Sequence, residues 1–499
     1  MAYNFKPFNR DQMYLLPPSM REWLPPGHLV WFIIDIIPQL DLAPFYKAYN
    51  PQGMGNAAYD PAMMVALYFY SYCVGERSSR KIEKNCLESV PFRIISGDLH
   101  PDHSTISRFR KKFEKELAAL FTQVLVFCGE AGLCDLATIS VDGSKIKANA
   151  SLAANRDEKG LEREIKKYLE EAKAIDAQED ELYGPDKRGD ELPPELATRE
   201  GRLEKLRKFK EKLAREKEEK MAAQQEKLEK RQQEEEASGR KKRGRKPKTV
   251  EKVAEEAEAK AKVNLTDPDS KIMRTAQEGH IQGYNGQIAV SQDQIILTAE
   301  LTQDQNDKKQ MIPMMEQTLE NIDPLLSPEN PDVGPFLFDA GYPSEENLAS
   351  LTPEHPEVIA AVKNEGKTKK DDNLLPIPLT LTAAMECKVR SPRGKELYAK
   401  RGSTVEPVFG QLKEILGFRR FSRRGFLACA WEWKMMCTAH NLLKLWRYGI
   451  EKVHQKVDDA AMQMEKLRES RTKAAWETRK YHEIEINCLP WSIGGAVAP

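Results

Sequence analysis

The segments that decide the fold are residues 136–148, LATISVDGSKIKA, and residues 334–343, GPFLFDAGYP. Each contains a short apolar run rich in β-branched or aromatic residues, a pattern that predicts a buried strand. Each run leads into an aspartate, Asp142 in the first and Asp339 in the second, followed by small residues. We expect both aspartates to lie at the ends of their strands, where small neighbours let a ligand approach the backbone.

Further strands and helices are predicted around these two segments. Residues 283–302, GYNGQIAVSQDQIILTAELT, predict two strands with a turn between them. Three consecutive strands followed by alternating helices and strands predict an α/β domain, a mixed sheet covered by helices. The same order matches the ribonuclease-H-like fold. The remaining predicted elements are a helix over 304–322, a strand over 357–364, and helices over 404–416 and 431–446.

The first part of the chain predicts an all-α region. An Asp-Pro pair at residues 60–61 is an N-cap followed by proline at the first helical position. Helices are predicted over 61–75, 78–89 and 104–132. Three helices with a basic start to the third resemble a helix-turn-helix arrangement. On the third helix, Ser104, Arg108 and Lys111 could lie along a DNA groove. The alternative is an amphipathic helix whose basic outer face is simply solvated.

A charged segment interrupts the predicted sheet. Between residues 201 and 260, 35 of 60 side chains are charged, 21 basic and 14 acidic. The leucines are too sparse for sustained heptads, so an exposed helical hairpin is predicted. Its tip, KKRGRKPK at 241–248, resembles a minor-groove hook in which Arg243 and Arg245 reach into A·T-rich DNA; the alternative is a solvated tip.

These patterns predict four parts. Residues 1–115 form a helical DNA-binding domain, and residues 116–150 plus 263–447 form the ribonuclease-H-like catalytic domain. Residues 151–262 are the charged helical insertion, and residues 448–499 are a charged helical tail without an assigned function.

Composition excludes several classes of protein. Hydrophobic residues make up 40% of the 499-residue chain, which excludes a fully disordered protein. Lys plus Arg and Asp plus Glu both number 77, so the net charge is zero. This excludes a nucleic-acid-binding protein whose whole surface is basic, but it permits one basic face. No long apolar run or signal peptide is evident, so we expect a cytoplasmic protein without membrane contact.

The eight cysteines include no CxxC pair, which favours buried reduced thiols. Cys429, Cys437 and His440 could be imagined as zinc ligands. Their spacing on an apolar helix favours a place in the core instead.

Three carboxylates are the candidate catalytic groups: Asp142, Asp339 and Glu406. A buried carboxylate is costly without a partner, and a divalent cation is one such partner. Each has an alternative interpretation. Asp142 and Asp339 could each begin a turn, and Ser403-x-x-Glu406 could be a capping box that opens a helix.

The groups around Glu406 indicate phosphate chemistry. Tyr398, Arg401 and Lys413 supply a phenol, a guanidinium and an ammonium, which are groups that bind phosphate. Three carboxylates without a required histidine or cysteine suit Mg²⁺, for which Mn²⁺ could substitute. A two-metal site of this kind catalyses phosphoryl transfer.

A basic run follows the third carboxylate. Residues 386–424 hold eleven Lys or Arg against four Glu. A basic rim beside a metal site fits binding of the DNA backbone, with Arg419 and Arg420 as candidates; the alternative is a solvated loop.

Together these segments resemble the DDE transposases of bacterial insertion sequences, of the IS eleven-eighty-two type. The resemblance covers about residues 10–450. Its motifs are ISVDGSKIKANAS, LTDPDSKIMRTAQEGHIQGYNGQIAV, LFDAGYPSEENL, AKRGSTVEPVFGQLKEILGFRRFSRRG and WKMMCTAHNLLKL, with YDPAMMVALYFYSYCVGERSSRKIEKNC and DHSTISRFRKKF near the start.

The resemblance implies a catalytic, metal-binding triad of Asp142, Asp339 and Glu406. Tyr398, Arg401, Glu406 and Lys413 resemble a Tyr-Arg-Glu-Lys signature, although four residues instead of three separate the arginine from the glutamate. The implied activity is Mg²⁺-dependent cleavage of the element's ends and strand transfer to target DNA. We expect a homodimer on DNA, associated with the bacterial nucleoid.

Two other functions stay open. One is a catalytically inactive or repurposed transposase that acts as a DNA-binding protein. The other is a metal-dependent nuclease with a different substrate class, which the extended resemblance disfavours.

Overall fold

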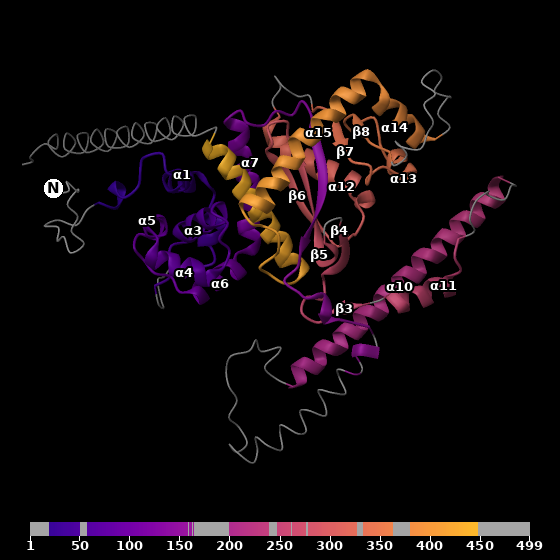
Figure 1. The fold of residues 1–499 in the computed structure, drawn as a ribbon, viewed down its shortest axis with the longest axis horizontal. Coiled ribbons are helices and arrows are strands. Elements are labelled where there is room, and N and C mark those ends of the chain that lie inside the picture. The colour runs from indigo at the N-terminus through magenta and orange to yellow at the C-terminus, as the bar shows by residue number, and fades with distance from the viewer. Residues whose placement is uncertain are drawn as a thin grey trace, which may run out of the picture.

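The computed structural model describes residues 19–49, 57–157, 159–161, 163, 199–238, 247–260, 262–275, 278–326, 333–362 and 380–447. The predicted tail and the hook residues Arg243 and Arg245 lie outside these ranges. Figure 1 shows a helical region, a sheet covered by helices, and a helical arm that projects from the sheet. None of the described helices has the length and apolar character needed to span a bilayer.

The sheet has six strands in the order β4-β5-β1-β7-β8, and β6 also pairs with β5. β1 is central: it runs antiparallel to β5 and parallel to β7, which in turn runs parallel to β8. The predicted mixed sheet is therefore confirmed. Its strands are β1 (Ile139–Lys147), β4 (Lys271–Thr275), β5 (Gly279–Val290), β6 (Ile296–Thr302), β7 (Phe336–Phe338) and β8 (Val358–Ala360).

One boundary was predicted wrongly. Asp142 lies inside β1, which continues through Gly143 to Lys147. The reason is β5, which pairs with β1 along the whole stretch from Ser140 to Lys147. A cross-strand ladder of this length overrides the turn tendency of an Asp-Gly pair. Asp339, by contrast, follows the last residue of β7, as predicted.

Helices cover both faces of this sheet. On one face, the Ser140 hydroxyl lies 2.6 Å from the Thr404 hydroxyl of α15 (Pro392–Gly410). On the other face, the Asn321 amide of α12 (Met311–Ile322) donates to the Thr298 hydroxyl at 3.0 Å. A helix over residues 426–447 packs on the α15 side, where Trp433 is fully buried beside Gly286. The other helices near the sheet are α13 (Glu345–Ala349) and α14 (Leu381–Arg390).

α15 begins earlier than the sequence predicted. The Ser391 hydroxyl caps it, so Glu406 lies inside the helix and does not open one. The capping-box interpretation was wrong: the Ser403 hydroxyl donates to the Lys400 carbonyl instead. Pro407 has no N–H to offer four residues back. The Ser403 carbonyl it leaves free accepts from the Gln294 side chain at 3.0 Å, which ties α15 to the turn after β5.

The first part of the chain is helical, as predicted. Asp60 caps α3 by accepting from the Ala62 N–H. The single predicted helix over 104–132 is instead two helices, because the chain breaks at Phe113, whose buried ring stacks with aromatic neighbours. The helix-turn-helix interpretation stays a prediction. The helices are α1 (Leu29–Ile36), α2 (Ala43–Tyr46), α3 (Pro61–Cys73), α4 (Ser79–Glu88), α5 (Val90–Ser96), α6 (His103–Lys112) and α7 (Glu114–Glu130).

This helical region is joined to the segment that follows α15. Arg77 donates to the carbonyls of Arg420 and Gly417 and lies 5.1 Å from the centroid of the Phe418 ring. A second joint is the ion pair between Arg423 and Glu114, whose side chains are mostly buried. The two parts therefore share one interface.

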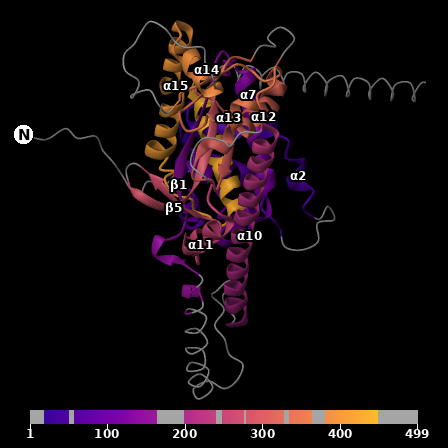
Figure 2. The ribbon, with the colours of Figure 1, turned by 90° about the vertical axis from the view of Figure 1, so that its right-hand side faces the viewer.

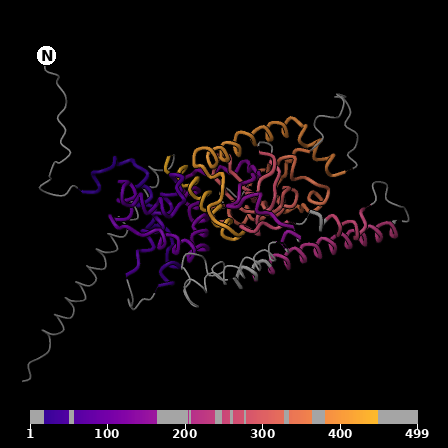
Figure 3. Tube along the Cα trace, turned by 60° about the horizontal axis from the view of Figure 1, so that its bottom comes forward, coloured from indigo at the N-terminus to yellow at the C-terminus, as the bar shows by residue number. Residues whose placement is uncertain are grey.

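The charged segment forms the arm. α10 (Arg199–Ser238) and α11 (Val250–Lys260) pack side by side and extend away from the sheet (Figures 1 and 2). Figure 3 shows α10 passing along one side of the body. A two-stranded pair, β2 (Asn155–Arg156) with β3 (Val263–Asn264), closes the base of the arm.

Substitution of Gly75 tests the close contact between the helical region and the segment that follows α15. Gly75 has a φ of +75°, and an added Cβ would lie 2.7 Å from the Leu416 carbonyl oxygen. Gly97 also has a positive φ, +60°, but its added Cβ would meet nothing within 4 Å. We expect Gly97→Ala to cost about 1 kcal/mol and Gly75→Ala about 2–3 kcal/mol more, because only the second adds a backbone clash. Thermal melting of both variants checks this; equal midpoints would contradict it.

Candidate active site

Asp142 and Asp339 lie next to each other at a gap in the sheet. β7 pairs with β1 only from Ile139 to Val141, and Val141 lies opposite Phe338. One step further along the same parallel register, Asp142 comes opposite Asp339. Beyond this point β7 has ended, so that edge of β1 is open until Lys147 bridges to Arg420. This open edge is the candidate active site.

A buried cationic partner holds Asp142. The Arg401 guanidinium of α15 lies 2.9 Å from the Asp142 carboxylate, and their side chains are 11% and 22% exposed. The Gly143 N–H also donates to this carboxylate at 2.8 Å. Burial nevertheless raises the pKa of Asp142 to about 6; Arg401 opposes the rise, while the charges of Asp339 and Asp307 add to it. The site thus holds more negative charge than Arg401 neutralises.

Asp307 is a fourth carboxylate that the sequence analysis missed. It begins a 3-10 turn before α12. Its Oδ1 accepts from Asn285 at 2.6 Å, from Gln287 at 2.7 Å and from Lys145 at 3.3 Å. Its Oδ2 lies 3.5 Å from the position a Cβ would take on Gly341, in the Asp339 loop. The polar pattern Asn285-x-Gln287 on an otherwise buried strand was the available signal, because such amides need a partner.

Gly143 makes room for this arrangement. Gly143 lies opposite Gln287 on β5, so the two face the same side of the sheet. A Cβ on Gly143 would lie 2.7 Å from Asp307 Oδ1 and would overlap the Gln287 amide. Close approach of Asp307 to β1 therefore requires glycine at this position.

Tyr342 closes the base of the site. Its hydroxyl donates to the side-chain amide oxygen (Oε1) of Gln287, and its ring is fully buried. Burial raises the pKa of Tyr342, and the charges of Asp307, Asp142 and Asp339 raise it further. Tyr342 therefore stays a neutral hydrogen-bond donor beneath the three aspartates.

Lys413 reaches the site from the end of α15. Its ammonium donates to the Ser144 hydroxyl, two residues after Asp142 on the same face of β1. Burial lowers the pKa of Lys413, and the negative charge of Asp142 opposes that change. Lys413 belongs to a π-helical turn, Gln411–Ile415, and such turns often occur at functional sites.

The structure does not bring the whole predicted triad together. Glu406 is exposed on α15, on the helical face that also carries Lys413. Tyr398 is half-buried earlier on the same helix. Within the ranges given above, no three acidic, histidine or cysteine side chains converge as they would around a metal ion. The role of Glu406 stays a prediction.

Of the other predicted DNA-binding residues, Arg419 lines the same cavity as Ser144 and Lys413. Arg419 pairs with Glu414, and Arg420 is exposed beside Lys147. On α6, the Ser104 hydroxyl accepts from Arg108 at 2.7 Å, and Arg108 and Lys111 are exposed.

The residues considered for zinc have places in the core. Cys429 and Cys437 are buried thiols, and burial raises the pKa of both. The His440 Nε2 lies 2.8 Å from the Gln294 carbonyl, and burial lowers the pKa of His440 to about 4. A neutral histidine that donates to a carbonyl is a structural contact.

The chemistry of the donor set fits a hard divalent cation. Asp142 and Asp339 follow paired residues of β1 and β7, and the negative charges of Asp339 and Asp307 both act on the Asp142 carboxylate. Mg²⁺ and Mn²⁺ prefer oxygen ligands and are held by one or two carboxylates in many enzymes. Asp142 and Asp339 would hold the ion, and Asp307 would support them.

Two protein-family models match parts of the chain. Residues 18–112, most of the helical region, match a transposase domain (DUF772). Residues 367–446, which include Arg401, Glu406 and Lys413, match a transposase DDE domain. No curated protein and no solved structure matches the chain. The two matches support the expectation of a DDE transposase of insertion sequences, and the DDE domain implies the ribonuclease-H-like fold. The IS eleven-eighty-two assignment stays a prediction.

The first test of the site concerns Asp307. Asp307→Asn keeps the shape of the side chain but removes its charge, and we expect it to weaken Mn²⁺ binding about 10- to 100-fold. Isothermal titration with Mn²⁺ measures this. Asp304→Asn is the matched control, because Asp304 lies three residues away and accepts from Gln310. Equal affinity in both variants would remove Asp307 from the site.

The second test concerns pH. The folded Asp142 carboxyl ionises near pH 6, whereas its usual pKa is 3.8. Between these values the folded chain keeps a proton that the unfolded chain has lost, so this group lowers the free energy of unfolding as pH rises. Mn²⁺ competes for the ionised carboxylate, so Mn²⁺ should raise the melting temperature more at pH 7.5 than at pH 5.

Asp142→Asn provides the control for the pH test, because an amide does not ionise. In this variant the Mn²⁺-induced rise should be small at both pH values. A variant that keeps the wild-type pH dependence of this rise would show that another group controls metal binding.

Proposed function

We propose that the chain, which carries a transposase domain and a DDE transposase domain, binds the ends of its insertion sequence and catalyses metal-dependent strand cleavage and strand transfer. The observation that carries this proposal is the pair formed by Asp142 and Asp339 at the open edge of β1. These residues lie outside both family matches, so they support the proposal independently.

The proposed chemistry has two steps on phosphodiesters. In the first, water attacks phosphorus at the element's end, and the bond to the 3′ oxygen breaks. This leaves a 3′-OH and a 5′-phosphate. In the second, that 3′-OH attacks a phosphodiester of the target strand, and the displaced oxygen leaves with a proton. Bound Mg²⁺ or Mn²⁺ would supply charge stabilisation for the attacking and leaving oxygens.

The residues of this chain position the reacting groups. Asp142 and Asp339 would hold the metal, and Arg401 fixes the orientation of Asp142 through its 2.9 Å ion pair. Lys413, held against Ser144, places a cation at the open edge where DNA phosphate would approach. Glu406 would complete the site by moving toward the aspartates when DNA and metal bind. Tyr398 would contact DNA further along α15.

Recognition of the element's ends requires groups that read bases, because phosphate contacts carry no sequence information. The exposed face of α6 with Ser104, Arg108 and Lys111 is the candidate reader. Two ends must be brought together, so we propose a homodimer on DNA.

The alternative function is a DNA-binding protein without catalysis. The position of Glu406, exposed and apart from the aspartates, is the observation that favours it. The cleavage experiment below distinguishes the two functions.

The experiment is a strand-cleavage assay on linear DNA that carries the element's own end, with Mg²⁺ or with EDTA. We expect metal-dependent nicking by the wild type and a loss of at least about 1,000-fold in Asp142→Asn, Asp339→Asn and Glu406→Gln, because each removes a negatively charged ligand. Glu396→Gln is the matched control, since Glu396 is an exposed glutamate on the same helix, α15, and lines none of the cavities near the site.

Each outcome assigns a function. Nicking lost in the three variants and kept in Glu396→Gln supports a transposase with this triad. Full activity of Glu406→Gln would exclude Glu406 from the triad. Binding of the end by the wild type without nicking would favour the non-catalytic protein.

A further inference from the structure

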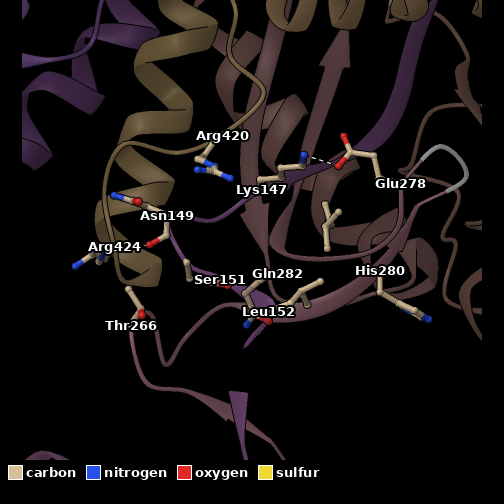
Figure 4. Close-up of a pocket in the computed structure, with 12 residues that line it drawn as sticks. Lys147, Asn149, Ser151, Leu152, Thr266, Glu278, His280, Gln282, Arg420 and Arg424 are labelled. Carbon is tan, nitrogen blue, oxygen red and sulfur yellow. Dashed lines mark hydrogen bonds and ion pairs between the residues drawn. The ribbon is translucent and has the colours of Figure 1, made fainter. Parts of the chain in front are cut away.

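Three neighbouring cavities form a continuous groove from the open edge of β1 to the helical region. The first, of about 420 Å³, includes Gly143, Ser144 and Lys413. It shares Lys147 and Glu278 with the second, of about 560 Å³, drawn in Figure 4. The second shares Asn149 and Arg420 with the third, of about 450 Å³. Shared walls make the three cavities one groove.

The far end of the groove lies at the start of α4. Ser78, Ser79 and Arg80 line the third cavity. Ser78 is the N-cap of α4, and its N–H donates to the Glu76 carboxylate at 2.8 Å, which also lies 3.4 Å from the Lys81 ammonium. Glu76 therefore already occupies part of this helix end, and the exposed positive charge there is that of Arg80.

The groove is strongly basic although the chain as a whole is neutral. Ten Lys or Arg side chains line it, against two glutamates. Four of these cations are paired with carboxylates: Lys147 with Glu278, Arg419 with Glu414, Lys145 with Asp307 and Arg77 with Glu432. In Figure 4, Arg420 and Arg424 lie on one side and the Lys147–Glu278 pair on the other. The ligand that this charge would attract is a polyanion.

The shape of the groove is fixed by contacts that leave its outer arginines exposed. Arg77 donates to the Arg420 carbonyl, which holds the backbone and not the side chain. Arg424 donates to the Asn149 carbonyl at 3.1 Å and stays exposed. Arg420 and Arg80 are exposed as well. A ligand can therefore reach these cations without opening the joint between the two parts of the chain.

We propose that one DNA backbone runs along this groove, from Lys413 past Lys147 and Arg420 to Ser79 and Arg80 on α4. This rests on the proposed function, and it adds the path and a second DNA-contacting element. The predicted reader on α6 lies elsewhere: Ser104, Arg108 and Lys111 line none of the three cavities. DNA held at the catalytic carboxylates thus meets α4 of the helical region and not the outer face of α6.

The test is the salt dependence of DNA binding. The probe is a labelled duplex of about 30 base pairs, and the dissociation constant is measured across a series of NaCl concentrations by fluorescence anisotropy. The variant is Arg80→Ala with Arg420→Ala. Its slope of log K against log salt should fall by about 2, one for each lost phosphate contact. The control is Lys84→Ala on the same helix, because Lys84 pairs with Glu88; its slope should stay unchanged.

A second variant separates the two candidate surfaces. Arg108→Ala with Lys111→Ala removes two cations from α6. If DNA follows the groove, the slope of log K against log salt should change less in this variant than in the Arg80→Ala, Arg420→Ala variant. Melting temperatures show whether each variant is folded. If a variant fails to fold, crosslinking replaces it: p-benzoylphenylalanine at Arg80 should crosslink the duplex, whereas at Lys84 it should not.

The outcomes distinguish the groove from the proposed function. Wild type that binds and cleaves DNA, with an unchanged slope in the Arg80 and Arg420 variant, would overturn the groove alone. Wild type that binds no DNA would overturn the function and the groove with it. A slope that falls only in the groove variant supports both the path and the role of α4.

Discussion

The arrangement of the sheet depends on negative charge buried along its central strand. Asp142 is half-buried and feels the negative charges of Asp339 and Asp307, and burial raises its pKa to about 6. Arg401 on one face and Lys145 on the other offset part of this charge. Truncating either cation would leave a buried carboxylate unpaired, which is among the costliest changes in a protein interior. Because Arg401 belongs to α15 and Asp307 directly precedes α12, these ion pairs hold both helices to the sheet in addition to packing.

α15 illustrates how this constraint is met. The helix contains Pro407, which removes a backbone hydrogen bond, yet the freed carbonyl of Ser403 is taken up by Gln294. Gln294 itself has a positive φ of 65°, and its carbonyl accepts from His440. One turn residue thus joins α15, the strand pair and the 426–447 helix. These contacts fix α15, and so they fix the position of the Arg401 guanidinium beside Asp142.

Much of this could be predicted from the sequence, because strands and buried helices have strong local patterns. The apolar runs before Asp142 and Asp339 identified β1 and β7, and their parallel pairing brought the two aspartates together. The start of α15 was missed because Ser403-x-x-Glu406 imitates a helix start, while the real cap is Ser391. Asp307 was missed because it lies in a polar loop, and only long-range pairing places it beside Gly143.

The base of the arm has a consequence for how the chain tolerates change. Only two residue pairs, Asn155 with Asn264 and Arg156 with Val263, join the strands at which the arm begins and ends. The chain thus leaves the sheet and returns to it at one point. α10 alone, with 40 residues, is about 60 Å long. Its length does not change the pairing of β2 with β3 at the base of the arm. Loop-closure entropy grows only slowly with length, so evolution or design can shorten or extend the arm beyond Lys212 and Glu216, which pair with Asp269 and Lys271, while the catalytic strands keep their register.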